Sequence, residues 1–199
     1  MQNDNISISG IKGMLHNFKT TFQGDLLSMQ EIRQTISEDQ KTKSDFIGLL
    51  EKHHDFLEES IAVLTDKEAS SAEKQVHLTR FIHLLFMHGK AEEETLYQSL
   101  KHAEEKEARL EGIAGQDEHD VAFQMAKELK AMDFEVSWSE EIDAKAKVLA
   151  SLVQNHINEE ETEMFTIAEN AIAPIKMDVI SGFYLEKCKV YLDEEILGI

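Results

Sequence analysis

Two stretches of the chain present the same metal-ligand residue types at the same spacing. Residues 87–97 (MHGKAEEETLY) and residues 155–165 (NHINEEETEMF) each contain a histidine, a glutamate four residues later, a second glutamate directly after it, and an aromatic residue nine positions past the histidine. Residues four apart on an α-helix project from one face, about 6 Å apart along the axis. His88 with Glu92, and His156 with Glu160, can therefore each offer an imidazole and a carboxylate to one ion.

The helices that must carry these residues follow from capping signals and apolar periodicity. The Ser-x-x-Glu spacing of a capping box occurs at Ser70 and at Ser137, and Gly112 and Gly115 interrupt the pattern between them. We expect four helices, over residues 44–64, 71–109, 115–132 and 137–170. A shorter helix is expected around residues 25–36, and a fifth long one beyond Pro174 with Ile180, Phe183, Leu185 and Tyr191 available for packing.

Steps of three and four residues along each helix trace the face that turns toward the core. These inward positions are Ile47, Leu50, His54, Leu57, Ile61 and Leu64; Leu78, Phe81, Leu85, His88 and Glu92; Gly115, His119, Ala122, Ala126 and Leu129; and Ile142, Ala146, Leu149, Val153, His156, Glu160 and Met164. Every helix places one histidine inward, and the second and fourth add a glutamate. Polar groups buried without partners cost free energy, so these six must satisfy one another or something that they share.

Hairpin geometry predicts that the histidines lie at one level. In an antiparallel pair of helices, residues at equal depth lie symmetrically about the turn. His54 and His88 are centred on residue 71, in the turn stretch KEASSA, and His119 and His156 are centred between residues 137 and 138, in DFEVSWS. Both pairs are therefore expected at one depth of the bundle, as in a weakly duplicated helical hairpin.

Six such ligands favour a two-metal site. Four imidazoles and two carboxylates are too many for one ion, and the glutamates can bridge a pair. Mixed nitrogen and oxygen ligands suit iron, manganese or zinc, whereas calcium prefers oxygen alone and soft sites use thiolate. The cores of helical bundles are known places for dinuclear carboxylate centres. The predicted ligands are His54, His88, Glu92, His119, His156 and Glu160.

The ordered set of ligands resembles the hemerythrin-like (HHE cation-binding) family. The segments HHDFLEES, HGKAEEETLY, DEHDVAFQMAKEL and HINEEETEMF are similar to its helix signatures, and the resemblance covers about residues 44–170. It implies a four-helix bundle around two non-haem iron ions, oxo- or carboxylate-bridged, that react with dioxygen, nitric oxide or peroxide.

Two positions depart from the oxygen-carrying members of that family. Those proteins have a second histidine one turn after the third-helix ligand, where this chain has Phe123, and an aspartate five residues after the fourth-helix histidine, where it has Glu161. The pattern is similar to four-His, two-Glu members, of which some repair nitrosatively damaged iron–sulfur clusters and others have peroxidase-like or sensing roles. The repair proteins carry a cysteine-containing N-terminal domain, and residues 1–43 contain no cysteine.

Other histidines and glutamates compete for these roles or have ordinary ones. His53 is the alternative to His54, or an outer partner of a ligand, and Glu161 is the alternative to Glu160. Glu58 is expected on the surface, because Leu57 holds the inward position. The remaining histidines are expected to be ordinary (His16, His77, His83 and His102), and an acidic exposed face is expected from Glu93, Glu94, Glu159, Glu161 and Glu163.

Composition limits the partners and the compartment. The net charge of -19 argues against nucleic acid and against anionic membranes, which need basic patches. No apolar run is long enough to span a membrane. The single cysteine, Cys188, and the lack of a basic-then-apolar N-terminal signal favour the cytoplasm.

The predicted fold is all-α, an up-down-up-down four-helix bundle over residues 44–170. A partly helical N-terminal extension (1–43) and a C-terminal helix packed on the bundle (171–199) complete the predicted domains. The predicted function is a di-iron protein that binds or reacts with a small diatomic or peroxide ligand, as a sensor, scavenger or stress-repair factor. The alternative is iron or zinc storage or delivery without redox turnover, and a third reading is a scaffold with incidental histidines. The sequence leaves any protein partner unknown and does not decide whether the chain is an enzyme.

Overall fold

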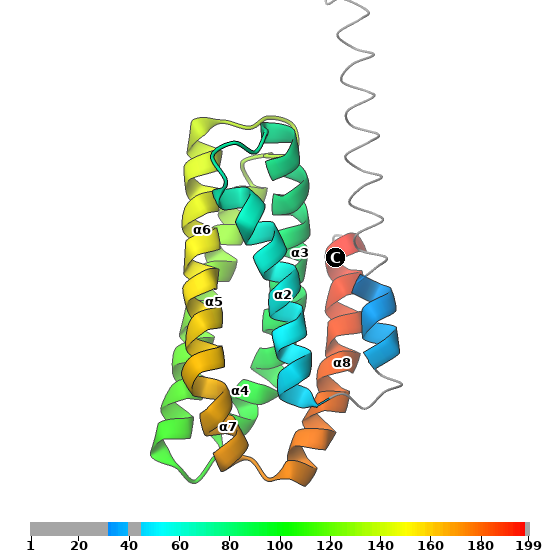
Figure 1. The fold of residues 1–199 in the computed structure, drawn as a ribbon, viewed down its shortest axis with the longest axis vertical. Coiled ribbons are helices and arrows are strands. Elements are labelled where there is room, and N and C mark those ends of the chain that lie inside the picture. The colour runs from blue at the N-terminus through cyan, green and yellow to red at the C-terminus, as the bar shows by residue number, and fades with distance from the viewer. Residues whose placement is uncertain (1–31, 40–44, 198–199) are drawn as a thin grey trace, which may run out of the picture.

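Four long helices stand side by side and form the body of the molecule (Figure 1). The structure, a computed structural model, describes residues 32–39 and 45–197, and in those ranges it contains helices and no strand. The four are α2 (Phe46–Thr65), α3 (Ser71–Glu94), α5 (Lys106–Lys130) and α6 (Glu140–Glu159). Each runs antiparallel to the one before it, which confirms the all-α, up-down-up-down bundle with added terminal helical segments.

The inward faces of these helices are apolar on both sides of one polar level. Every position predicted to face inward is buried, from Ile47 on α2 to Met164 beyond the end of α6. Burying a Leu, Ile or Phe side chain stabilises a fold by about 1.5–3 kcal/mol. The apolar layers therefore hold the helices together, while the six polar residues between them must be explained separately.

The reversal between the second and third long helices comes earlier than the sequence indicated. Thr95 (φ -122°, ψ -78°) ends α3, the short α4 (Leu96–Lys101) follows, and the chain turns back over residues 102–105. This turn has no glycine or proline; Arg109 Nη1 instead donates to two carbonyl oxygens near the turn, at 2.9 and 2.6 Å. Because the stabilising group comes from the next helix, local turn signals did not reveal the reversal.

Gly112 and Gly115 lie inside α5, so their interpretation as a helix interruption is wrong. A Cβ atom on Gly112 would lie 2.8 Å from Leu100 Cβ and 3.0 Å from the carbonyl oxygen of Tyr97. A Cβ atom on Gly115 would lie 2.8 Å from Tyr97 Cζ. The two glycines therefore mark the close approach of α4 to α5.

The fourth long helix continues past α6. A π-helical turn (Glu160–Met164) and α7 (Phe165–Ala171) extend it, close to the predicted end at residue 170. π-Turns within α-helices occur frequently at functional sites, and this one begins at a candidate ligand.

Two predicted helix starts have different outcomes. The capping box of Ser70 and Glu73 at the start of α3 is confirmed. The cap of α6 is Ser139, whose Oγ accepts a hydrogen bond from the Ile142 backbone at 3.2 Å, and the prediction of Ser137 is wrong. The backbone nitrogen of Ser137 is still bonded within the preceding turn, to the carbonyl of Asp133.

α8 (Pro174–Leu197) lies along the outer side of α3 and also contacts α2 (Figure 1). Residues 32–39 form a short helical segment beside it, and Arg33 makes a 2.5 Å ion pair with Asp193 of α8. The earlier residues of the helix predicted around 25–36, and of the extension 1–43, lie outside the described residues. No helix in the described ranges is long and apolar enough to cross a membrane.

The packing residues of α8 differ in part from the expected set. Ile180 and Leu185 are buried, as predicted, and Tyr191 is half-buried. Phe183 is 55 % exposed, so its predicted packing role is wrong, because the neighbouring Tyr184 takes the inward position. The division of the chain into 1–43, 44–170 and 171–199 remains a prediction.

Candidate metal centre

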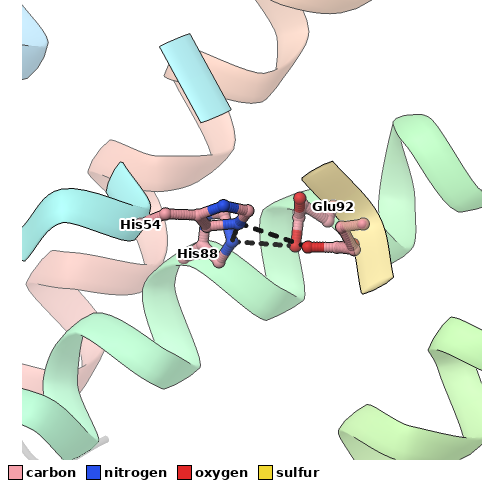
Figure 2. Close-up of side chains that lie close together, drawn as sticks. His54, His88 and Glu92 are labelled. Atoms are coloured by element: carbon pink, nitrogen blue, oxygen red, sulfur yellow. Dashed lines mark hydrogen bonds and ion pairs between the residues drawn. The ribbon is translucent and has the colours of Figure 1, made fainter. Parts of the chain in front are cut away.

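The six predicted ligands converge at one level inside the bundle. Their exposed fractions run from 0 % for the two glutamates to 7 % for His156. Ligand atoms of His54, His88, Glu92 and Glu160 lie within 4.8 Å of one another, and Glu92, His119 and His156 form a second such group. Figure 2 shows the imidazoles of His54 and His88 turned toward the carboxylate of Glu92. Because Glu92 belongs to both groups, they are two halves of one cluster.

The histidines meet in pairs across each helical hairpin. His54 Nε2 lies 3.1 Å from His88 Nε2 between α2 and α3, and His119 Nε2 lies 2.9 Å from His156 Nε2 between α5 and α6. The structure therefore places each pair at equal depth, as the positions of the two turns predicted.

Each carboxylate spans the two histidine pairs. Glu92 Oε2 lies 3.0 Å from His88 Nε2 and 3.7 Å from His119 Nε2. Glu160 Oε2 lies 3.5 Å from His156 Nε2 and 3.2 Å from His54 Nε2. The cluster thus has approximate twofold symmetry, with both glutamates in bridging positions.

The outer ring nitrogens of two histidines contact glutamates. His54 Nδ1 lies 2.8 Å from Glu161 Oε1, and His156 Nδ1 lies 2.6 Å from Glu118 Oε2. Histidines that bind metals usually donate the N–H of their second nitrogen to such a partner, which fixes the tautomer and the ring orientation. Here the partners leave Nε2 of both rings directed into the cluster.

The other two histidines also face polar groups on their outer side. His119 Nδ1 lies 3.8 Å from Glu93 Oε1, a near approach rather than a hydrogen bond. His88 Nδ1 lies 2.6 Å from the phenol oxygen of Tyr184, which comes from α8. All four inward histidines are therefore oriented with Nε2 inward and Nδ1 outward.

Three of these outer partners correct or extend the sequence interpretation. Glu93 and Glu161 were predicted as exposed surface. Glu161 is exposed, as predicted, but it also contacts an imidazole, whereas the Glu93 side chain is only 12 % exposed and faces one. The signal was present, since each is the second glutamate of a repeated motif. Glu118 was missed, and its only sequence signal is its place directly before His119.

Tyr97 is a further residue of the cluster that the sequence interpretation missed. Its hydroxyl donates to Glu160 Oε1 at 2.6 Å and lies 3.3 Å from His119 Nε2 and 3.2 Å from His156 Nε2. The repeat had marked it as the aromatic nine residues past the first histidine. The matching aromatic, Phe165, stacks on His54 with ring centroids 5.7 Å apart and has no hydroxyl. Only one half of the cluster therefore has a phenol among its inner atoms, within the described residues.

The pKa values of His54 and His156 are set by the carboxylates beside them. Burial alone would lower the pKa of His54, but the neighbouring carboxylates of Glu160 and Glu161 raise it to about 10. Burial likewise opposes protonation of His156, but the charge of Glu160 and the hydrogen bond with Glu118 raise its pKa to about 9. A cation that binds Nε2 of these rings must displace their protons.

Burial is the largest influence on the pKa values of the other four groups of the cluster. Burial lowers the pKa of His88 and His119 well below the usual value, so both rings are neutral. Burial and the neighbouring Glu160 raise the pKa of Glu92 well above its usual range. Burial would do the same for Glu160, but the charge of His156 and its contact with His54 hold its pKa below the usual range.

The donor set fits a pair of cations. Among the described residues, both oxygens of Glu92 and Oε2 of Glu160 have no hydrogen-bond partner, although both side chains are fully buried. Buried polar atoms without partners are costly, and a cation between the carboxylates and the imidazoles would remove that cost. Phe123 is buried beside His119, with ring centroids 5.5 Å apart, and offers no ligand atom at that position.

The competing residues fall outside both ligand groups. His53 is buried, but its Nδ1 contacts Tyr184 Oη at 2.7 Å, and His54 is the α2 histidine that enters the cluster. Glu58 accepts a hydrogen bond from Gln154 at 2.6 Å, away from the ligand groups. His77, His83 and His102 are in neither group found among the described residues, and His16 lies outside those residues.

Comparison with known protein families agrees with this geometry. A family model described as the hemerythrin HHE cation binding domain matches residues 45–168, which is more than half of the chain. Neither a curated protein nor a solved structure matches the chain. The matched segment contains all six residues of the cluster and ends before α8. The chain therefore belongs to the hemerythrin HHE cation-binding domain family.

Proposed function

We propose that the cluster binds a pair of non-haem iron ions. The ligands would be the two histidine pairs, with both glutamates as bridges: His54 and His88, His119 and His156, Glu92 and Glu160. The observation that carries the proposal is that one oxygen of each glutamate faces a histidine of both pairs, at 3.0–3.7 Å. Mixed imidazole and carboxylate ligands suit iron, and manganese or zinc are the alternative metals.

We propose further that the site binds or reacts with dioxygen, nitric oxide or peroxide, as a sensor, scavenger or stress-repair factor. When bound, the irons supply electrons and open coordination positions for such a ligand. Four imidazoles and two shared carboxylates do not fill the coordination of two ions. Phe123, Met164 and Phe165 are 3–4 % exposed and keep bulk water from this level of the bundle. Tyr97 holds a proton at Oη, beside Glu160 and the second histidine pair.

The alternative function is metal handling, meaning iron or zinc storage or delivery without redox turnover. It uses the same buried imidazoles and carboxylates, and the raised pKa of His54 and of His156 means that metal uptake would release protons and weaken at lower pH. Slow, reversible release of metal without any reaction toward dioxygen or nitric oxide would favour this alternative.

The proposed partner is a small ligand rather than nucleic acid or a membrane. The net charge of -19 disfavours phosphate-rich surfaces. The described part of the chain has one cysteine, Cys188, which is buried and unpaired, and a reducing compartment suits such a thiol. We propose the cytoplasm as its location on that ground.

The test is elemental analysis of the full chain after anaerobic loading with ferrous iron, with optical spectra before and after air, nitric oxide or hydrogen peroxide. We expect about two irons per chain, as in other dinuclear bundle sites, and ligand-to-iron charge-transfer bands that change with the small ligand. Protein that takes up no metal under these conditions would refute the metal centre. Protein that takes up metal but shows no spectral response would leave the metal-handling alternative.

A further inference from the structure

His88 differs from the other inward histidines in what lies behind it. The other three have a glutamate oxygen 2.6–3.8 Å from Nδ1. His88 Nδ1 instead lies 2.6 Å from the phenol oxygen of Tyr184, a neutral group carried by α8. α8 lies outside residues 45–168, the segment that matches the family model.

The duplicated hairpins show what Tyr184 replaces. In the α5–α6 hairpin, Glu118 directly precedes His119 on α5. Its carboxylate contacts Nδ1 of His156 on α6 at 2.6 Å. In the α2–α3 hairpin the corresponding residue is His53, whose ring centroid lies 6.0 Å from that of His88. Tyr184 Oη joins the two rings, 2.7 Å from His53 Nδ1 and 2.6 Å from His88 Nδ1.

The phenol of Tyr184 is held firmly in this place. Tyr184 and His53 are both 0 % exposed, and the tyrosine ring packs edge-on against Phe46 with centroids 5.6 Å apart. Cys188, one turn further along α8, is also fully buried. A neutral phenol has one hydrogen to donate and can accept one from a neighbour, which matches two imidazole nitrogens on either side.

We propose that Tyr184 is the positioning residue of His88, so that α8 completes the metal centre rather than only covering it. His88 Nδ1–H donates to Tyr184 Oη, and the hydroxyl of Tyr184 donates to His53 Nδ1. This arrangement fixes the tautomer of His88 and leaves the Nε2 lone pair directed at Glu92 and the cluster. The inference rests on the proposed metal-binding function and adds a residue outside the family segment to it.

One consequence is that the two metal positions differ in their imidazole ligands. A carboxylate that accepts a hydrogen bond from a ligating imidazole makes the ring a stronger donor. In the second pair, Glu118 contacts His156 Nδ1 at 2.6 Å, and Glu93 approaches His119 Nδ1 only to 3.8 Å. The first pair has a glutamate behind His54 and a neutral phenol behind His88. The two positions therefore differ in the outer partners that orient their imidazoles, and the position beside His88 is the one that depends on Tyr184.

The test compares Tyr184→Phe with Tyr191→Phe in the full chain. Both changes remove one hydroxyl from α8, but the Tyr191 hydroxyl donates to Glu94 at the surface, away from the cluster. Iron content and affinity are measured by competition with a chelator under anaerobic conditions, with the spectrum of the oxidised protein as a second readout. For Tyr184→Phe we expect one of the two ions to bind about 10–100-fold more weakly, the usual effect of losing an outer partner. Tyr191→Phe should match the wild type.

Several outcomes separate this inference from the proposed function. Wild-type affinity and an unchanged spectrum in Tyr184→Phe would overturn the role of Tyr184 and leave the metal centre intact. Wild-type protein that binds no ion would instead defeat the metal centre itself.

A variant-free measurement covers the case in which Tyr184→Phe does not fold. In zinc-loaded wild-type protein, a long-range proton–nitrogen correlation spectrum should show an exchange-protected proton on His88 Nδ1. A His88 ring with no proton on Nδ1 would overturn the proposed hydrogen bond.

Discussion

Each inward histidine uses its two ring nitrogens for different purposes. Nε2 faces the opposite ring of its pair, at 3.1 Å for His54 and His88 and 2.9 Å for His119 and His156. In His54, His88 and His156, Nδ1 contacts a group outside the cluster at 2.6–2.8 Å, which holds the ring in one orientation. A neutral histidine in an ordinary core needs a partner for its one N–H. A metal ligand needs one ring nitrogen held by an outer partner and the other directed at the ion, which is the arrangement seen here.

His156→Leu tests this division of labour at a single residue. Leucine fills similar space but offers no nitrogen to the metal. Losing an outer partner of a ligand weakens metal binding by up to about 100-fold, and we expect the loss of the ligand itself to weaken iron binding further. The matched control is His102→Leu, an exposed histidine whose Nδ1 contacts only the Gln98 carbonyl among the described residues, at 2.7 Å. Chelator competition measures both variants, and equal affinities for the two would contradict a ligand role for His156.

At the scale of helices, two irregular turns place the aromatic residues of the cluster. The break at Thr95 follows Glu92 by three residues, and the π-turn 160–164 begins at Glu160. Nine residues of straight α-helix are about two and a half turns, which would put Tyr97 on the face opposite His88. The break after α3 instead lets Tyr97 reach Glu160, and Gly115 of α5 leaves room for its ring.

Gly112→Ala tests the contact between α4 and α5. The added Cβ would lie 2.8 Å from Leu100 Cβ and 3.0 Å from a backbone oxygen, so α4 must shift. We expect a loss of about 1–3 kcal/mol in the free energy of unfolding, as for other overpacked sites, measured by urea denaturation. Gly182→Ala on α8 is the control, because, apart from its chain neighbours and the adjacent backbone of its own helix, no heavy atom of the described structure lies within 4 Å of the added Cβ. That variant should gain about 0.5–1 kcal/mol from helix propensity, and a Gly112→Ala protein of equal stability would contradict the close approach.

Asp143→Asn tests how α6 is attached to α3. Asp143 accepts hydrogen bonds from Lys74 at 2.8 Å, Lys147 at 2.6 Å and Trp138 at 3.2 Å. Burial would raise the pKa of Asp143, but these hydrogen bonds lower it to about 2, from 3.8 for the free side chain. A depressed carboxyl pKa contributes stability that is fully present above about pH 4 and is lost as pH falls toward 2.

The expected result is a loss of about 1 kcal/mol in the free energy of unfolding of Asp143→Asn at pH 7, as for a well-placed ion pair. The difference from the wild type should shrink as pH falls through 4 toward 2, when followed by denaturant unfolding. Glu128→Gln, which removes the exposed partner of Lys145 between α5 and α6, is the control and should change stability less. A difference that did not depend on pH over this range would contradict the assigned hydrogen bonds.

At the scale of the whole molecule, charge and metal binding act together. The chain carries a net charge of -19, and such self-repulsion destabilises a compact state. Two of the acidic side chains that this charge includes, Glu92 and Glu160, are fully buried in the cluster. Cations bound among them offset both the charge and the cost of burial, so the folded state should depend on its metal content.

Metal removal is therefore expected to lower the melting temperature of the full chain. An ion present at about 100 times its dissociation constant stabilises the folded state by about 2.7 kcal/mol. For a chain of this size that is a shift of about 5–10 °C. Calorimetry of chelator-treated protein, before and after anaerobic iron is restored, measures the shift. Identical melting temperatures in the two states would contradict metal binding in the folded core.

The sequence by itself determined the bundle and the level at which the six polar residues meet. The inward stripes follow from helical periodicity, and the pairing of His54 with His88 and of His119 with His156 follows from the positions of two turns. Both are properties of distance along the chain, which a sequence records directly. The order of the ligands also carried the family resemblance over residues 44–170.

Only the tertiary structure decided what surrounds the six residues. Tyr184 lies 96 residues from His88, and Arg109 satisfies a turn that has no local signal of its own. Tyr97 enters the cluster because α3 breaks at Thr95 and α5 offers a glycine, so its position depends on two helices at once. These contacts depend on how separate helices pack against one another. The neighbours of one side chain across such an interface produce no periodic pattern in the sequence, so the sequence alone does not predict them.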